Sequence, residues 1–145
     1  MVFGWFKKKK PAPASQDVYA GLRNQVLSLK ANEIGVSQSA ELPVVWGVVM
    51  ETGYPDATVT LVSLADRTTS LYFSNGGGVI GAGEHEHVAL ATAEFIALAG
   101  SFLGQMTPTT TFPTPGVGRV RFYLLTFSGV VTAEAKRTRS WVRTP

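Results

Sequence analysis

The stretch that decides the fold reads V-V-W-G-V-V-M at residues 44–50. It is rich in β-branched side chains and too short for a helix, so it predicts a central strand that is buried on both faces. A G-Y-P-D turn follows at residues 53–56 and leads to a second predicted strand at residues 58–64. A third strand is expected at residues 69–73, after another tight turn. Consecutive strands joined by short turns favour antiparallel pairing.

Two helices are predicted around these strands. Val18, Leu22, Val26 and Leu29 recur at helical spacing, so we expect a helix over residues 16–33. Gly35 is its expected stop. A second helix is expected after the glycines that follow the third strand. The apolar residues that mark its buried face are Val88, Ala91, Phe95, Ile96, Ala99, Phe102 and Leu103.

The C-terminal part predicts a hairpin. Residues 107–118 contain three prolines and are expected to form a loop. Strands are predicted at residues 119–127 and 130–134, with a turn at Ser128-Gly129. The order α-β-β-β-α-β-β predicts a single α+β domain with a mostly antiparallel five-stranded sheet. We expect both helices on one face of that sheet.

Charge divides the chain into three parts. Residues 1–14 form a basic, aromatic, Pro/Ala-rich tail, residues 15–135 the α+β domain, and residues 136–145 a second basic tail. The two tails hold eight of the 13 Lys and Arg residues, whereas residues 16–135 carry five basic and ten acidic side chains. A basic stripe on the folded body is therefore missing, and no specific nucleic-acid partner is expected. Because there is no cysteine, disulfides and thiol chemistry are excluded.

Two features carry a resemblance to known groups. The phrases S-L-Y-F-S-N-G-G-G-V-I-G-A-G at residues 70–83 and R-V-R-F-Y-L-L-T-F at residues 119–127 resemble a group of uncharacterised bacterial proteins. The order of elements resembles that of type III secretion chaperones and YbjN-like proteins, and more loosely that of roadblock and profilin-like modules. Because a fold does not determine a function, the resemblance brings no activity with it.

A glycine-rich segment after the third predicted strand is the candidate ligand site. A strand–glycine–helix junction can direct several N–H groups at an anion, although no complete phosphate motif is present. The alternative is a connection in which glycines allow close packing. His85 and His87 are weak candidates for a metal, because neighbours two apart diverge on a helix. No cofactor is expected. The candidate ligand-binding residues are Ser74, Asn75, Gly76, Gly77, Gly78, Gly81, Gly83 and His85.

One face of the fourth predicted strand is a candidate interface. Alternation along the strand places arginine and aromatic side chains together, which are favoured at protein interfaces. The predicted interface residues are Trp46, Arg119, Arg121, Tyr123, Leu125 and Phe127. The alternative is that another segment covers them.

The N-terminal tail predicts contact with an anionic membrane surface. Three aromatic residues precede four lysines, a pattern that suits insertion at a lipid interface. These residues are Phe3, Trp5, Phe6, Lys7, Lys8, Lys9 and Lys10. The alternative is a solubilising tail. No transmembrane run is seen in the sequence. The protein is expected in the cytoplasm, with the tail at the membrane periphery.

Together these features predict a non-enzymatic interaction module, chaperone-like or an adaptor, that binds a protein partner and forms a homodimer. The alternative is a small domain that binds an anionic ligand at the glycine segment.

Overall fold

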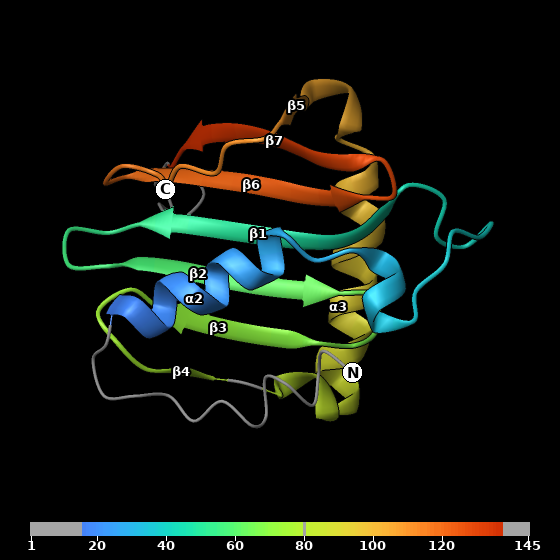
Figure 1. Cartoon of the computed structure of the whole chain (residues 1–145), viewed down its shortest axis with the longest axis horizontal. Helices are drawn as coiled ribbons and strands as arrows, with labels where there is room; N and C mark the ends of the chain where they lie inside the picture. The colour runs from blue at the N-terminus through green and yellow to red at the C-terminus, as the bar shows by residue number, and fades with distance from the viewer. Residues whose placement is uncertain (1–15, 80, 138–145) are drawn as a thin grey trace, which may run out of the picture.

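The computed structural model describes residues 16–79 and 81–137 of the chain (Figure 1). Two α-helices and a seven-stranded sheet, in the order β4-β3-β2-β1-β6-β7-β5, make up this part. All neighbouring strands are antiparallel. The elements are α2 Gln16–Leu27, a 3₁₀ turn Ala31–Ile34, β1 Val45–Gly53, β2 Thr58–Leu64, β3 Thr69–Phe73, β4 Gly78–Val79, a 3₁₀ turn Ala82–Glu84, α3 Glu86–Gly100, a 3₁₀ turn Leu103–Gln105, β5 Thr107–Thr109, β6 Arg119–Thr126 and β7 Gly129–Lys136.

The α+β class and the antiparallel sheet are confirmed, but the predicted strand number is wrong. The sheet has seven strands because β4 and β5 extend its two edges. Both are short edge strands of unusual composition. The first is Gly-Val and the second is Thr-Pro-Thr, and neither glycine nor proline is typical of a strand interior.

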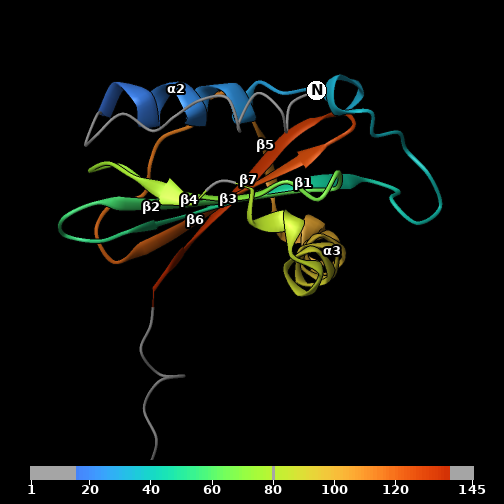
Figure 2. The ribbon, with the colours of Figure 1, turned by 90° about the horizontal axis from the view of Figure 1, so that it is seen from below.

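The two helices lie on opposite faces of the sheet, so the prediction of a shared face is wrong (Figure 2). The reason lies in β1, whose residues Val48 and Val49 point to opposite faces and are both fully buried. A strand that is apolar on both faces needs a cover on each side. Helix α2 covers one face and α3 the other (Figure 2).

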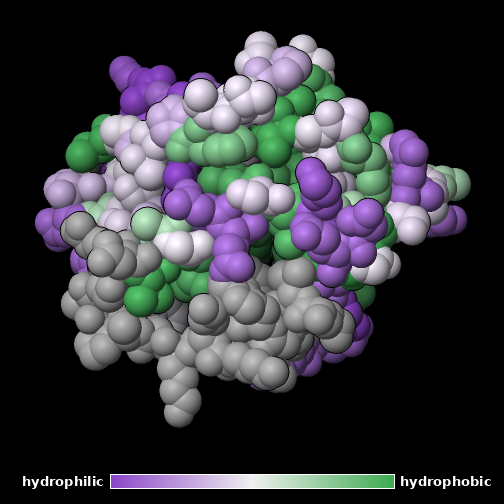
Figure 3. Space-filling view, viewed as in Figure 1, coloured by the Kyte–Doolittle hydropathy of each residue, from purple (hydrophilic) through white to green (hydrophobic). Residues whose placement is uncertain are grey.

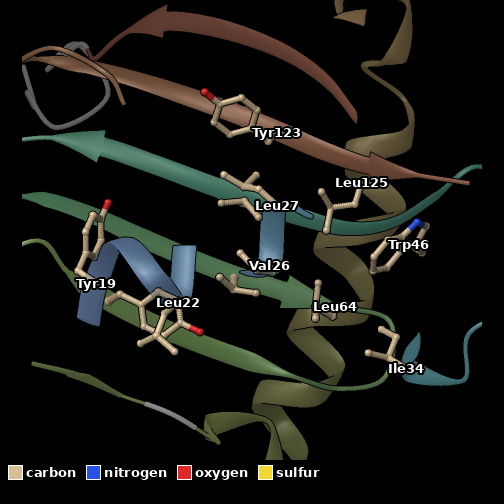
Figure 4. Close-up of a cluster of buried hydrophobic side chains, with 12 residues drawn as sticks. Tyr19, Leu22, Val26, Leu27, Ile34, Trp46, Leu64, Tyr123 and Leu125 are labelled. Atoms are coloured by element: carbon tan, nitrogen blue, oxygen red, sulfur yellow. The ribbon is translucent and has the colours of Figure 1, made fainter. Parts of the chain in front are cut away.

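The larger core lies between α2 and the sheet. Hydrophilic side chains lie over α2 on the outside of this face (Figure 3). Beneath them, the apolar side of α2 packs against Trp46 of β1, Leu64 of β2 and Leu125 of β6 (Figure 4). A Cβ at Gly47 would lie 2.7 Å from a Leu64 methyl group, so a larger residue here would require the Leu64 side chain to shift. The buried members from α2 and the turn after it are Tyr19, Leu22, Val26, Leu27 and Ile34.

The smaller core lies between α3 and the sheet. Helix α3 crosses behind the strands at one end of the sheet (Figures 1 and 2). Its buried residues are Ala89, Thr92, Ile96 and Ala99, at spacings of three or four. The predicted buried face was wrong for Ala91 and Phe102, which are exposed, whereas Phe95 is half-buried and packs against this core. Apolar residues of α3 itself lie on several sides of the helix, so their spacing does not define which side is buried.

Candidate functional site

The glycine segment is divided between the two ends of β3. Gly76 and Gly77 have φ of 114° and 83° and form the turn from β3 to β4. Gly83 lies at the other end, where a Cβ would sit 1.7 Å from the carbonyl oxygen of Arg67. The five residues of β3 separate these two groups by about 15 Å at 3.3 Å per residue. Gly76 and Gly77 thus form a hairpin turn, and Gly83 allows two backbone segments to approach closely.

This geometry does not support the predicted anion site. Helix α3 begins at Glu86 with His85 as its N-cap, after β4 and a 3₁₀ turn. Its N-terminus is therefore not joined directly to the glycine turn, and Ser74 instead accepts a hydrogen bond from the backbone of Thr58. The ring centroids of His85 and His87 are 6.1 Å apart. Within the described part of the chain, no group of three or more His, Cys, Asp or Glu side chains could hold a metal ion.

Three of the six predicted interface residues are buried in the core beside α2, so the expectation that they form an open face is wrong. Trp46, Tyr123 and Leu125 are 2%, 0% and 1% exposed. They belong to the core that α2 completes (Figure 4). Phe127 packs at the edge of the same cluster. Alternation along β6 correctly grouped these residues on one face, but it does not reveal which element covers that face.

A buried ion pair on this face was not found in the sequence. Arg23 of α2 donates two hydrogen bonds to the carboxylate of Glu51 in β1, at 2.7 and 2.9 Å. Thr60 of β2 donates to the same carboxylate at 2.8 Å, and its hydroxyl lies 2.7 Å from that of Tyr19. Arg23 also donates to the carbonyl oxygen of Phe112 at 2.6 Å. The network joins α2, two strands and the loop before β6.

The electrostatics of this network are those of a closed structural cluster. Burial alone would lower the pKa of Arg23, but the hydrogen bonds and charge of Glu51 raise it instead. Burial also raises the pKa of Tyr19. The Glu51 side chain is fully buried and the Arg23 side chain is only 10% exposed. Because a bidentate pair satisfies the carboxylate, the cluster fixes α2 on the sheet.

A second ion-pair cluster lies across β6 and β7. Arg119 and Arg121 both pair with the carboxylate of Glu134. The hydrogen bond from Arg119, together with that from Arg121, lowers the pKa of Glu134 despite some burial. The guanidinium of Arg121 also lies 6.0 Å from the ring centre of Tyr123. These two predicted interface arginines therefore have internal partners on the sheet.

An open apolar surface lies on the other side of the sheet, beside α3. A groove of about 430 Å³ runs between α3 and the strands β1, β6 and β7. We call it the α3 groove. Its lining is almost wholly apolar and consists of Val48, Phe95, Leu98, Ala99, Phe102, Gln105, Met106, Phe122, Leu124, Ala133, Glu134 and Ala135.

The outer side of α3 is also apolar. Leu90 and Leu98 are each 58% exposed, and Phe102 just after the helix is 43% exposed. The helix has the sequence E-H-V-A-L-A-T-A-E-F-I-A-L-A-G and contains no Lys or Arg. Apolar residues thus lie on several sides of α3, which is typical of an element covered on more than one side. The sequence contained this signal in the excess of apolar residues over one buried stripe.

A second groove lies on the other flank of α3. It has a volume of about 510 Å³ and lies between the helix and the segment before β1. Small residues of α3, among them Ala93 and Ala97, form one wall, and Val44 and Leu64 contribute to the other. Both flanks of α3 are thus hollow, whereas its inner side is packed.

The N-terminal residues 1–14, predicted to contact membranes, lie outside the described residues, as do residues 138–145. Neither helix in the described part of the chain is both long and apolar enough to cross a bilayer. Comparisons of the chain with protein-family models, with curated proteins and with solved structures found no match. Function is therefore inferred from the geometry of the described residues.

Proposed function

We propose that this protein is a non-enzymatic module that binds another protein through the α3 groove. The observation that carries the proposal is the apolar surface at Leu98 and Phe102, which borders a groove lined by sheet and helix residues. Contiguous apolar surface of this kind is typical of interaction sites. Aromatic side chains such as Phe95 and Phe122 in the groove are the type enriched at the centre of interfaces.

Helix α2 covers the centre of the opposite face, and a groove of about 800 Å³ remains there between the segment after α2 and the turn that joins β6 and β7. There α2 presents hydrophilic side chains outward (Figure 3) and is fixed by the Arg23–Glu51 pair. An interface through the fully buried Tyr123 would first require α2 to leave the sheet and expose that buried pair, at a cost of several kcal/mol. Binding at the α3 groove requires no such rearrangement. The predicted homodimer stays a prediction, and the α3 side is the surface on which it would form.

Site-specific photocrosslinking in the native cell tests the proposal. A photoreactive amino acid at position 98 should yield a crosslinked protein adduct, whereas the same group at Gln25, exposed on α2, should not. The adduct is identified by mass spectrometry, and the binding is then measured with the two purified proteins. Equal crosslinking from both positions, or none from position 98, would contradict the proposal.

A further inference from the structure

We infer that the partner element is a basic amphipathic helix that lies beside α3 on the open part of the sheet. The inference rests on the proposed function, because it names the chemistry of the partner at the same site. Three observations lead to it: the shape of the α3 groove, the sheet face that forms its floor, and the charge of α3.

The groove has the form of a site for a second helix. Its wall is the flank of α3 that carries Phe95 and Leu98, three residues apart, and Phe102 continues this wall just after the helix. This spacing places Phe95 and Leu98 along one side of the helix, as in helix–helix contacts. Its floor is formed by Phe122 and Leu124 of β6 with Val48 of β1. On this side of the sheet α3 is the only α-helix among the described residues, and it covers one end of the strands (Figure 2).

The floor continues away from α3 as an apolar surface. Met50 of β1 pairs with Leu61 of β2 and with Phe122 of β6, so these three side chains share the α3 face. All three are only half-buried. A helix that crossed four strands in parallel with α3 would need about 15 Å, or roughly ten residues at 1.5 Å each.

A helix fits this floor better than an extended segment. Strand addition takes place at sheet edges, where backbone N–H and C=O groups are free to pair. The groove instead presents the face of the sheet, and an extended segment there would leave its own backbone groups unpaired. A helix satisfies these groups internally and presents only side chains.

The charge of α3 selects a basic partner. Glu94 is exposed one turn before Leu98, and no ion pair forms to it within residues 16–79 and 81–137. Glu86 is also exposed, although it pairs with Arg67 at 3.3 Å. The helix itself has no Lys or Arg. A Lys or Arg of the partner would complement Glu94, whereas an anionic bilayer or a second α3 would bring like charges together.

The test uses the full chain and two synthetic 18-residue helical peptides with the same leucine stripe. One peptide carries lysine at its polar positions and the other carries glutamate. Titration calorimetry should show the lysine peptide binding at least tenfold more tightly. Leu98→Ser should weaken that binding at least tenfold, whereas Leu90→Ser is a matched control of equal 58% exposure that does not line the groove. The control should change the affinity less than twofold, and Glu94→Lys should remove the preference.

Several results would overturn the inference. The basic helix is rejected as the partner if the two peptides bind equally tightly. It is also rejected if Leu98→Ser and Leu90→Ser weaken the affinity for the lysine peptide equally. If light scattering shows a wild-type dimer and the Leu98→Ser variant is a monomer, the occupant of the groove is a second copy of the chain. If the wild type sediments with anionic phospholipid vesicles and Leu98→Ser reduces this sedimentation, the occupant of the groove is a bilayer. If deletion of residues 1–14 raises the peptide affinity tenfold, the occupant of the groove is the chain's own N-terminal segment.

This test separates the inference from the proposed function. A photocrosslinked partner at position 98, combined with no preference for the lysine peptide, would leave the binding module in place and reject only the basic helix.

Discussion

Replacing Arg23 by leucine tests how α2 is held on the sheet. The substitution removes both hydrogen bonds to Glu51 and leaves a fully buried carboxylate with the Thr60 hydroxyl at 2.8 Å. Breaking a buried pair in this way costs about 3–5 kcal/mol of unfolding free energy. For a chain of 145 residues, that loss corresponds to a decrease of about 10–15 °C in Tm.

The double variant separates the cost of an unpaired charge from the value of the pair itself. Arg23→Leu/Glu51→Leu should regain most of the lost stability, because no buried charge is left. It should stay about 1 kcal/mol below the wild type, since the Phe112 carbonyl loses the donor that lies at 2.6 Å. Arg119→Leu is a control on a pair whose arginine is 43% exposed, and it should cost about 1 kcal/mol or less.

Urea unfolding followed by far-UV circular dichroism gives the free energies for all these variants. The reasoning would be refuted by a loss below about 1 kcal/mol in Arg23→Leu, or by a double variant as unstable as the single one. Either result would show that Glu51 finds another partner or is reached by water.

Local geometry and charge give three further predictions. Gly83→Ala should lower the unfolding free energy by about 3 kcal/mol, because the new Cβ would lie 1.7 Å from the Arg67 carbonyl oxygen. Gly100→Ala, with nothing within 4 Å of its Cβ, should raise it by about 0.5 kcal/mol; the reverse order in urea unfolding would contradict both. Glu134→Gln should lower stability at pH values above 4.5, the ordinary pKa of a glutamate carboxyl, because a carboxylate with a lowered folded-state pKa stabilises the fold only while ionised. The difference from wild type should vanish as the pH falls through the folded-state pKa, and a difference that persists in strong acid would reject this role.

The sequence was most informative where chain-local signals determine structure. The bounds of β2 and β3 match their predicted ranges, because each is a β-branched or apolar run between clear turns. The hairpin from β6 to β7 was also predicted, although its turn is Phe127-Ser128, one residue before the predicted Ser128-Gly129. The first helix ends at Leu27, short of the predicted residue 33, because a separate 3₁₀ turn follows it.

The sequence was least informative where distant segments meet. Which helix covers which face depends on the path of the chain around the sheet, and no local spacing records that path. The ion pair joins residues 28 apart in sequence. A signal was nevertheless present, because Arg23 lies among the apolar positions of α2 and Glu51 directly follows the apolar run of β1. A charged residue on each of two buried faces predicts a pair.

The candidate site shows the same limit. Alternation along β6 selected Tyr123 and Leu125 as a surface, but α2 covers them. The apolar excess of α3 indicated a helix with more than one covered side, and only the structure shows that Leu98 and Phe102 stay exposed.

Hydrogen–deuterium exchange with the partner identified by photocrosslinking tests the central claim most directly. Binding should slow amide exchange in α3 and in β6 and β7, which form the α3 groove, and leave exchange in α2 unchanged. Protection over α2 with no change in α3 would contradict the account, because it would place the partner on the face that the Arg23–Glu51 pair closes.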